Sequence, residues 1–301
     1  MPIYNVNNLK DNFKNFLETK YTLLKVDSVP NPRFGIVLVG DGFSSMKYAQ
    51  MKLKLAIELG IEADFLHFQD DVKTEVIQNI LEDYRVNGGG LLFQLPIRSD
   101  LKELVYKTPL NSDVDLLGSE RSKLIAISYL PPTIGAIDLI LKDILTSQNQ
   151  DFNHLMENKI SLKGINIAVI GQGVLVGSPL IEYLLKTEAT IISVNIHSNK
   201  PKELTQQADI LISATGKADL IDETWLKKSY EKDGIIFPLV IDAGTSEGKI
   251  EAEDKTIIST LVGDVNKESV EDICTLVGVP GGVGPITVRY IFWNLYRLYQ
   301  N

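Results

Sequence analysis

The sequence has a single cysteine, Cys274, so no disulfide bond can form within the chain. That scarcity fits a reducing compartment, and we expect Cys274 to be a small buried apolar residue rather than a reactive thiol. The chain also lacks an apolar run of the roughly 18 residues that a membrane span requires, and its N-terminus lacks the apolar core of a signal peptide. A cytoplasmic location is therefore expected.

Histidine is also scarce, and the chain has no net positive charge. The three histidines, His67, His154 and His197, are far apart and follow no metal-ligand spacing, so no metal site is expected. The formal net charge of -9 gives no positive field that favours nucleic acid or an anionic membrane surface. With 301 residues, 44% of them hydrophobic, the chain is long enough for two globular domains, and a small-molecule partner is expected.

Short apolar runs alternate along the chain with segments of helical period. The first series consists of FGIVLVG from residue 34, SSMKYAQMKLKLAIELG, IEADFLHF, KTEVIQNILEDYRV and GLLFQL. The second begins at residue 164 with GINIAVI and continues with GQGVLVGSPLIEYLL, TIISVNI, DILISAT and PLVIDAGT. Strands that alternate with helices predict an α/β fold with parallel sheets, and the boundary between the two series is expected within residues 119–160.

The strongest local motif is VIGQGVLVGSP, residues 169–179, which reads as a strand, a glycine turn and a helix. Gly171 permits the tight turn, Gly173 lets the backbone approach a pyrophosphate, and the helix N-terminus supplies free N–H groups. Gly177 falls one residue later than in the common G-x-G-x-x-G fingerprint. The motif predicts dinucleotide binding, with a purely structural glycine turn as the alternative.

The end of the next strand, where many NAD enzymes place an acidic residue on the ribose, reads VNIHSNK. It offers His197, Ser198 and Lys200 but no carboxylate. This composition leaves room for a 2'-phosphate, and an ordinary polar loop is the alternative interpretation.

A second glycine-rich loop, GVPGGVGPIT at residues 278–287, precedes the helical stripe VRYIFWNLYRLY, and Pro285 suits the first turn of that helix. Its glycines exceed what a turn requires and would let the backbone approach a flat ligand. A structural lead-in to the helix remains the alternative.

In the first half of the chain, Tyr48 and Lys52 are four residues apart and should share one helical face. Gln94 ends a predicted strand, and Asp113 and Asp115 lie in a predicted loop, where aspartate is common for its turn hydrogen bonds. Each residue alone is compatible with a structural role, but together they suggest a cleft.

The segments VGDGFSSMKYAQMK, GLLFQLP, SDVDLLG, VIGQGVLVGSP, VIDAGT and GVPGGVGPIT resemble, in order and separation, the methylenetetrahydrofolate dehydrogenase/cyclohydrolase family. The resemblance runs from about residue 3 to the C-terminus. It implies an α/β fold of two lobes: a catalytic, folate-binding domain at 1–140, completed by 280–301, and a Rossmann-type NAD(P)-binding domain at 141–279. It also implies a homodimer with folate bound between the lobes.

The resemblance further implies oxidation of 5,10-methylenetetrahydrofolate to the methenyl form with NADP, and hydrolysis of that product to 10-formyltetrahydrofolate, in one-carbon metabolism and purine biosynthesis. By analogy Lys52 is the catalytic lysine, Tyr48 orders the folate, Gln94 orients the lysine and Asp115 holds the pteridine ring. Further implied folate contacts are Pro280, Gly281 and Gly282. Implied cofactor contacts are Gly171, Gln172, Gly173, Gly177, Ser198 and Thr245.

The sequence departs from the family pattern at four places. Gln172 and Gly173 replace the arginine and serine of Gly-Arg-Ser, which removes a cation suited to a 2'-phosphate; Lys200 could compensate, and NAD is the alternative cofactor. Ser112 and Leu116 replace the lysine and final glycine of Lys-Asp-Val-Asp-Gly, LPPTIG lacks the cysteine of Pro-Cys-Thr-Pro, and Thr245 replaces isoleucine. Two alternative functions therefore stay open: a monofunctional NAD-dependent dehydrogenase, and a folate- or nucleotide-binding protein without turnover.

Overall fold

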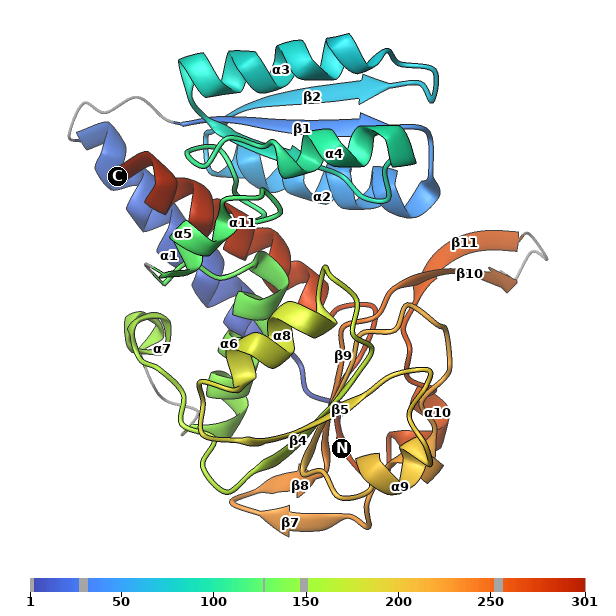
Figure 1. Ribbon diagram of the computed structural model, residues 1–301. Helices are drawn as coiled ribbons and strands as arrows, with labels where there is room; N and C mark the ends of the chain where they lie inside the picture. The colour runs from blue at the N-terminus through green and yellow to red at the C-terminus, as the bar shows by residue number, and fades with distance from the viewer. Residues whose placement is uncertain (1–2, 27–31, 127, 147–150, 252–256, 301) are drawn as a thin grey trace. The chain divides into compact units, whose positions relative to one another are not determined.

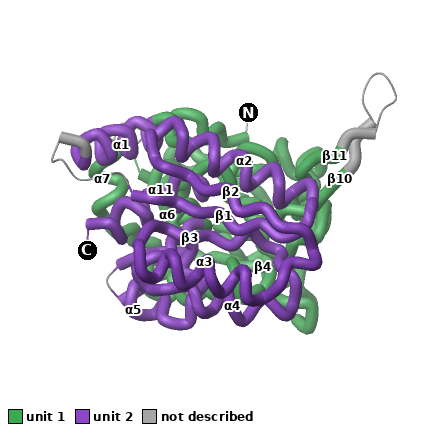
Figure 2. Tube along the Cα trace, turned by 90° about the horizontal axis from the view of Figure 1, so that it is seen from above, with its two compact units in different colours: residues 1–11, 133–286 green, residues 12–132, 287–301 purple. Residues whose placement is uncertain are grey.

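The structure is a computed structural model that describes residues 3–26, 32–126, 128–146, 151–251 and 257–300 (Figure 1). The chain divides into two compact units (Figure 2). Unit 1 contains residues 1–11 and 133–286, and unit 2 contains residues 12–132 and 287–301. The chain passes from one unit to the other within three helices, α1 (Asn7–Val26), α6 (Pro132–Leu145) and α11 (Val283–Gln300).

Unit 2 is built on a three-stranded parallel sheet with the order β2-β1-β3. Its strands are β1 (Arg33–Val39), β2 (Glu62–Phe68) and β3 (Gly90–Phe93), joined by helices α2 (Phe43–Glu58) and α3 (Thr74–Asn87). The predicted alternation of strands and helices is confirmed here. The rest of the unit contains α4 (Lys102–Tyr106), which follows a short 3-10 helix (Ser99–Leu101), and α5 (Arg121–Ala126).

The core of unit 2 includes aromatic contacts between α1, β1 and α11. The rings of Phe34 and Phe292 lie 5.0 Å apart, and those of Phe13 and Tyr290 lie 6.0 Å apart. The buried Tyr21 hydroxyl donates a hydrogen bond of 2.8 Å to the Phe292 carbonyl oxygen. The predicted C-terminal helix is confirmed, whereas α1 was not predicted from the sequence. The C-terminal helix thus supplies part of the core of the unit that contains Lys52.

Unit 1 contains a five-stranded parallel sheet with the order β12-β9-β6-β4-β5. The strands are β4 (Asn166–Ile170), β5 (Thr190–Val194), β6 (Ile210–Ser213), β9 (Leu239–Asp242) and β12 (Thr275–Val277). After β5 the chain crosses to the opposite side of β4 and forms β6 there. The strand order therefore reverses between β4 and β6, which is the topological switch point where open α/β sheets bind ligands.

Unit 1 contains further elements besides this sheet. Ile3 pairs with Leu276 of β12, and the Tyr4 N–H donates to the Leu276 carbonyl oxygen over 2.8 Å, which places the N-terminal residues in unit 1. The sequence did not predict the hairpins β7–β8 (Tyr230–Lys232 and Ile235–Phe237) and β10–β11 (Ser246–Glu251 and Ile257–Val262). Besides most of α6, the α-helices described in unit 1 include α7 (Phe152–Glu157), α8 (Gly177–Leu184), α9 (Pro201–Thr205) and α10 (Lys267–Val270).

Cys274 is fully buried in an apolar cluster of unit 1, which confirms its predicted environment. Burial raises the pKa of its thiol to about 12. Within the described residues, no helix combines the length and apolar character needed to cross a membrane.

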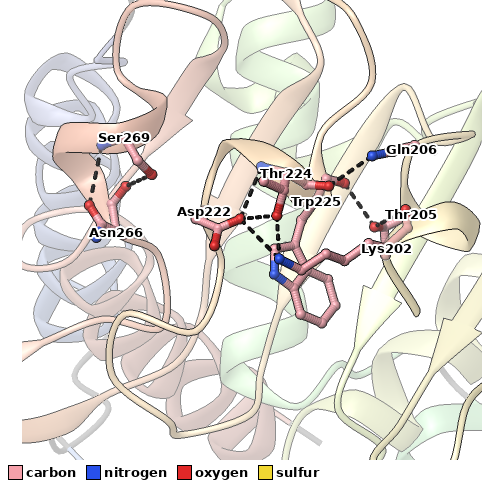
Figure 3. A network of polar contacts seen from close by, with 8 residues as sticks. All are labelled: Lys202, Thr205, Gln206, Asp222, Thr224, Trp225, Asn266 and Ser269. Carbon is pink, nitrogen blue, oxygen red and sulfur yellow. Dashed lines mark hydrogen bonds and ion pairs between the residues drawn. The ribbon is translucent and has the colours of Figure 1, made fainter. Parts of the chain in front are cut away.

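A polar network fixes α9 to the 3-10 helix Glu223–Trp225 (Figure 3). The Thr205 hydroxyl donates to the Trp225 carbonyl oxygen over 2.8 Å. The Lys202 ammonium lies 3.5 Å from Asp222 Oδ1 and 5.7 Å from the centre of the Trp225 ring. The network anchors the helix that follows the loop at the end of β5, and it pairs the charge of Lys202 with Asp222.

Candidate functional site

Lys52 lies on the buried face of α2, with 8% of its surface exposed. Its ammonium group donates a hydrogen bond of 2.6 Å to Gln94 Oε1. Gln94 directly follows β3, where its backbone N–H donates to the Val37 carbonyl oxygen and its Nε2 donates to the Leu95 carbonyl oxygen. Because both ends of the amide are engaged, the Gln94 oxygen is held toward the lysine.

Burial shifts the pKa values of both Lys52 and Asp115. Burial lowers the pKa of Lys52 to about 8, and the negative charge of Asp115 opposes that effect. The pKa of Asp115 is itself raised by burial, and the positive charge of Lys52 opposes this shift. A lysine with a pKa near neutrality is suited to gain or lose a proton during a reaction. The arrangement is therefore chemically suited to proton transfer.

Asp113 and Asp115 have different surroundings although they are two residues apart. The buried Asp113 carboxylate accepts hydrogen bonds from the backbone N–H groups of Leu117 and Gly118, at 3.1 and 2.8 Å. Burial raises the pKa of Asp113 to about 6. Asp113 therefore organises the loop, whereas Asp115 is coupled to Lys52.

The two substitutions in this loop have structural consequences. Ser112 is fully buried, and its hydroxyl donates to the Tyr84 carbonyl oxygen over 3.3 Å. Leu116 has a φ of 55°, in the left-handed region that glycine adopts with less strain. Its fully buried side chain packs with Leu124 and Tyr129, and this burial offsets the backbone strain.

The predicted residues of unit 2 are therefore partly brought together. Lys52, Gln94 and Asp115 interact, although they are far apart in the sequence. Tyr48 is half-buried and lies one helical turn before Lys52 on α2, as the spacing predicted. The folate-site candidates Pro280, Gly281 and Gly282 belong to unit 1.

The glycine turn after β4 leads into helix α8, as predicted from the motif. Gly171 has a φ of +98°, and a Cβ there would lie 2.4 Å from the Ala214 carbonyl oxygen. A Cβ on Gly177, the first residue of α8, would lie 2.0 Å from the Gly171 carbonyl oxygen. By contrast, a Cβ on Gly173 would meet no atom within 4 Å. Packing requires the outer two glycines, whereas Gly173 leaves open space that fits the close approach of a pyrophosphate.

The Gln172 side chain forms a polar cluster with the end of β5. Its Nε2 donates to Ser193 Oγ over 2.6 Å, and its Oε1 accepts from Asn195 Nδ2 over 2.8 Å. Ser198 Oγ in turn accepts from the Asn195 backbone N–H at 3.0 Å. Lys200 pairs with Glu203 at 2.9 Å. Ser193 and Asn195 were not among the predicted residues, although their position at a strand end next to the motif could have indicated them.

The remaining cofactor and folate candidates lie in loops of unit 1. Thr245 is exposed between β9 and β10. Gly281 has a φ of +102°, and a Cβ on the buried Gly282 would lie 2.5 Å from the Gly278 carbonyl oxygen. Backbone geometry thus accounts for these two glycines, and the role of the loop in folate binding stays a prediction.

A family profile matches half of the chain, and the sequence of a relative matches most of it. The family profile described as tetrahydrofolate dehydrogenase/cyclohydrolase, NAD(P)-binding domain, matches residues 150–301. The chain is 31% identical to the bifunctional protein FolD of Lactobacillus acidophilus over 288 residues, which cover 94% of this chain and 91% of that protein.

The chain is also similar to solved structures over nearly its whole length. The bifunctional enzyme FolD of Campylobacter jejuni is 25% identical with a TM-score of 0.79, covering 99% of this chain and 98% of that one. The methylenetetrahydrofolate dehydrogenase-cyclohydrolase of Trypanosoma brucei, complexed with NADP and an inhibitor, has a TM-score of 0.84 at 20% identity, covering 99% of this chain and 97% of that one. At that identity the likeness to the Trypanosoma brucei structure concerns the fold.

Proposed function

The chain belongs to the tetrahydrofolate dehydrogenase/cyclohydrolase family, and on that basis we propose that it is a bifunctional enzyme of one-carbon metabolism. It oxidises 5,10-methylenetetrahydrofolate to 5,10-methenyltetrahydrofolate with NADP, and it hydrolyses the product to 10-formyltetrahydrofolate. The observation that carries the proposal is the buried Lys52, which is hydrogen-bonded to Gln94 and coupled to Asp115. A protein that only bound folate would have no evident use for a lysine with a lowered pKa.

The dehydrogenase reaction requires the one-carbon bridge of the folate to contact the nicotinamide ring. The dinucleotide supplies the hydride acceptor. Gly171 and Gly177 shape the turn, and the open space beside Gly173 would admit the pyrophosphate. The other residues proposed to contact the cofactor are Gln172, Ser198 and Thr245.

Hydrolysis of the methenyl cation requires a water molecule that loses its proton during attack. Lys52 is proposed to accept that proton at Nζ, because its pKa of about 8 makes the neutral amine accessible near neutral pH. Gln94 orients the amine, and Asp115 is proposed to bind the pteridine ring and to tune the lysine. Tyr48 would order the folate, with Pro280, Gly281 and Gly282 as further contacts.

One observation favours the alternative, a monofunctional NAD-dependent dehydrogenase. Gln172 is neutral, and its amide is already engaged by Ser193 and Asn195. Lys200 and Lys202 pair with carboxylates, so a 2'-phosphate would have to compete for their charges. A Gln172→Arg variant should therefore raise the ratio of kcat/KM for NADP over NAD by about tenfold, because arginine forms charge-assisted hydrogen bonds with phosphate.

One absorbance assay tests the main function. Methenyltetrahydrofolate formation from methylenetetrahydrofolate is followed by absorbance with NADP and NAD in parallel, and its decay is then followed against an enzyme-free control. Formation with NADP and accelerated decay support the bifunctional enzyme. Formation only with NAD, without accelerated decay, would replace it by the dedicated dehydrogenase, and binding of folate without formation would leave a binding protein.

The remaining assignments are part of the same proposal. Residues 1–140 with 280–301 would form the catalytic, folate-binding domain, and residues 141–279 the Rossmann-type domain. A homodimer, a cytoplasmic location and the lack of a nucleic-acid partner are proposed from the family resemblance and the acidic composition.

A further inference from the structure

Two buried aspartates of unit 1 have no role in the mechanism proposed above. Asp264 follows β11 and is completely buried. Its Oδ2 accepts hydrogen bonds from Ser213 Oγ at 2.7 Å and from the Thr215 N–H at 2.6 Å, and its Oδ1 accepts from the Lys217 N–H at 2.9 Å. All three donors belong to the end of β6 and the loop that follows it. One carboxylate therefore holds residues 213–217 from within the protein.

Asp242, the last residue of β9, supports Asp264 in turn. Its Oδ1 accepts from the Gly244 and Asp264 N–H groups, at 3.0 and 3.1 Å. Its Oδ2 accepts from the Val265 N–H at 3.0 Å. The Asp242 side chain thus fixes the backbone at Asp264 and Val265.

The packing around the two carboxylates leaves no room for a side chain beside them. A Cβ on Gly244 would lie 2.0 Å from the Asp264 carboxylate, and a Cβ on Gly263 would lie 1.9 Å from Asp242 Oδ2. Each aspartate therefore packs against a glycine α-carbon on a neighbouring segment. Because both oxygens of each carboxylate face N–H or O–H donors, an amide in either orientation would set its own N–H groups against donors.

The loop held by Asp264 forms one side of the switch point in the sheet. The Ala214 N–H donates to the Ile170 carbonyl oxygen at the end of β4, and the Ala214 carbonyl oxygen faces the α-carbon of Gly171. The loop after β6 and the glycine turn after β4 are therefore in contact at the crevice where such sheets bind dinucleotides. Ser246 adds a second link, because its hydroxyl donates to the Gly216 carbonyl oxygen over 2.8 Å.

We propose that Asp264, held in place by Asp242, is a positioning residue that fixes residues 214–217 in the conformation that receives the dinucleotide. The inference rests on the proposed NAD(P)-dependent function and extends it to residues outside the proposed folate and cofactor contacts. The aspartates act through backbone N–H groups and the Ser213 hydroxyl, so their effect reaches the cofactor only through the loop.

The test compares Asp264→Asn, which acts at the C-terminal end of β6, with a matched variant at the other end of that strand. Asp209, immediately before β6, accepts from the Asn166 N–H at 2.9 Å and from Lys227 Nζ at 2.6 Å, so Asp209→Asn also removes a hydrogen-bonding carboxylate, but at the opposite end of β6. The dissociation constant of NADPH is measured by fluorescence titration. Hydrolysis of methenyltetrahydrofolate is measured without dinucleotide, and amide hydrogen exchange is followed in residues 214–217.

Asp264→Asn should weaken NADPH binding by about tenfold or more and accelerate exchange in residues 214–217, since hydrogen bonds to a charged acceptor are lost. Hydrolysis should stay within about twofold of the wild-type rate, because it uses no dinucleotide. Asp209→Asn should leave NADPH binding unchanged. Ser213→Ala, which removes one donor and keeps the carboxylate, should change binding in the same direction by a smaller factor, and it serves if Asp264→Asn does not fold.

Four results would overturn the proposal. Accelerated exchange with unchanged NADPH affinity would mean that the loop is held but does not serve the cofactor. A parallel loss of binding and hydrolysis in both asparagine variants would mean a general structural role. A wild-type protein that binds neither NADPH nor NADH would refute the proposed function and this inference with it, whereas normal wild-type binding that the variants leave unchanged refutes the inference alone.

Discussion

Hydrolysis of methenyltetrahydrofolate should follow the protonation of Lys52 over a defined pH range. Burial lowers the pKa of this lysine from 10.5 to about 8. At pH 7 about one molecule in ten then carries the neutral amine, against fewer than about one in a thousand for an ordinary lysine. If the neutral amine accepts the proton from water, kcat/KM for hydrolysis should rise about tenfold from pH 6 to pH 7 and level off above the pKa.

The structure also identifies which change should move this profile. The negative charge of Asp115 raises the pKa of Lys52, so Asp115→Asn should shift the inflection to lower pH. The profile is measured as kcat/KM after subtraction of the enzyme-free rate, because kcat/KM reports the ionisation of the free enzyme. A drop in kcat/KM without a shift of the inflection would show that Asp115 binds substrate but does not tune the lysine.

Replacing the lysine separates catalysis from stability. Lys52→Met should abolish hydrolysis, while Lys54→Met on the exposed side of α2 should leave it unchanged. A shift of the pKa from 10.5 to about 8 corresponds to about 3 kcal/mol of destabilisation by the buried charge. Because the unfolded chain binds the proton more tightly, this cost is fully present at pH 7, and stability should rise as the pH increases from about 8 to 10.5.

Lys52→Met removes that cost, but it also leaves Asp115 without its opposite charge. Because the two effects oppose each other, the Tm at pH 7 should stay below the value that relief of about 3 kcal/mol alone would produce. Thermal unfolding followed by circular dichroism measures this. Hydrolysis that is independent of pH between 6 and 8, or that survives in Lys52→Met, would refute the assignment of Lys52 as the proton acceptor.

Further predictions concern the glycine turn and the cysteine. Gly177→Ala should lower the Tm on the order of 5 °C, because its Cβ would lie 2.0 Å from the Gly171 carbonyl oxygen; a wild-type Tm in thermal unfolding would contradict this packing. Gly173→Ala should keep the wild-type Tm but weaken NADPH binding in a fluorescence titration, and unchanged affinity would argue against a pyrophosphate at this turn. Cys274, with a pKa raised to about 12 by burial, should react with a thiol reagent only after unfolding in guanidinium; rapid labelling of the native protein would contradict its burial.

The sequence by itself determined the local structure well. Apolar periodicity located the strands and helices of both series, because burial on one face of an element leaves a repeat in the chain. The glycine turn was placed correctly between β4 and α8, since a tight turn and close packing each restrict the residue type. Helix α1 was missed although its buried residues recur at helical spacing, at Leu9, Phe13, Leu17, Tyr21 and Leu24. The two hairpins were missed because short strands depend on their cross-strand neighbours and leave a weaker pattern in the sequence.

Only the tertiary structure decided which distant residues interact. Helical spacing put Tyr48 and Lys52 on one face, but it did not determine whether Lys52 was solvated or buried, or that Gln94 accepts its hydrogen bond. Asp242 and Asp264 look like ordinary acidic residues in the sequence, and their role emerges only where β6, β9 and the segment after β11 meet. The physical reason is that periodicity records the burial of one face of an element, whereas a pKa or a shared hydrogen bond depends on the groups that folding brings against it.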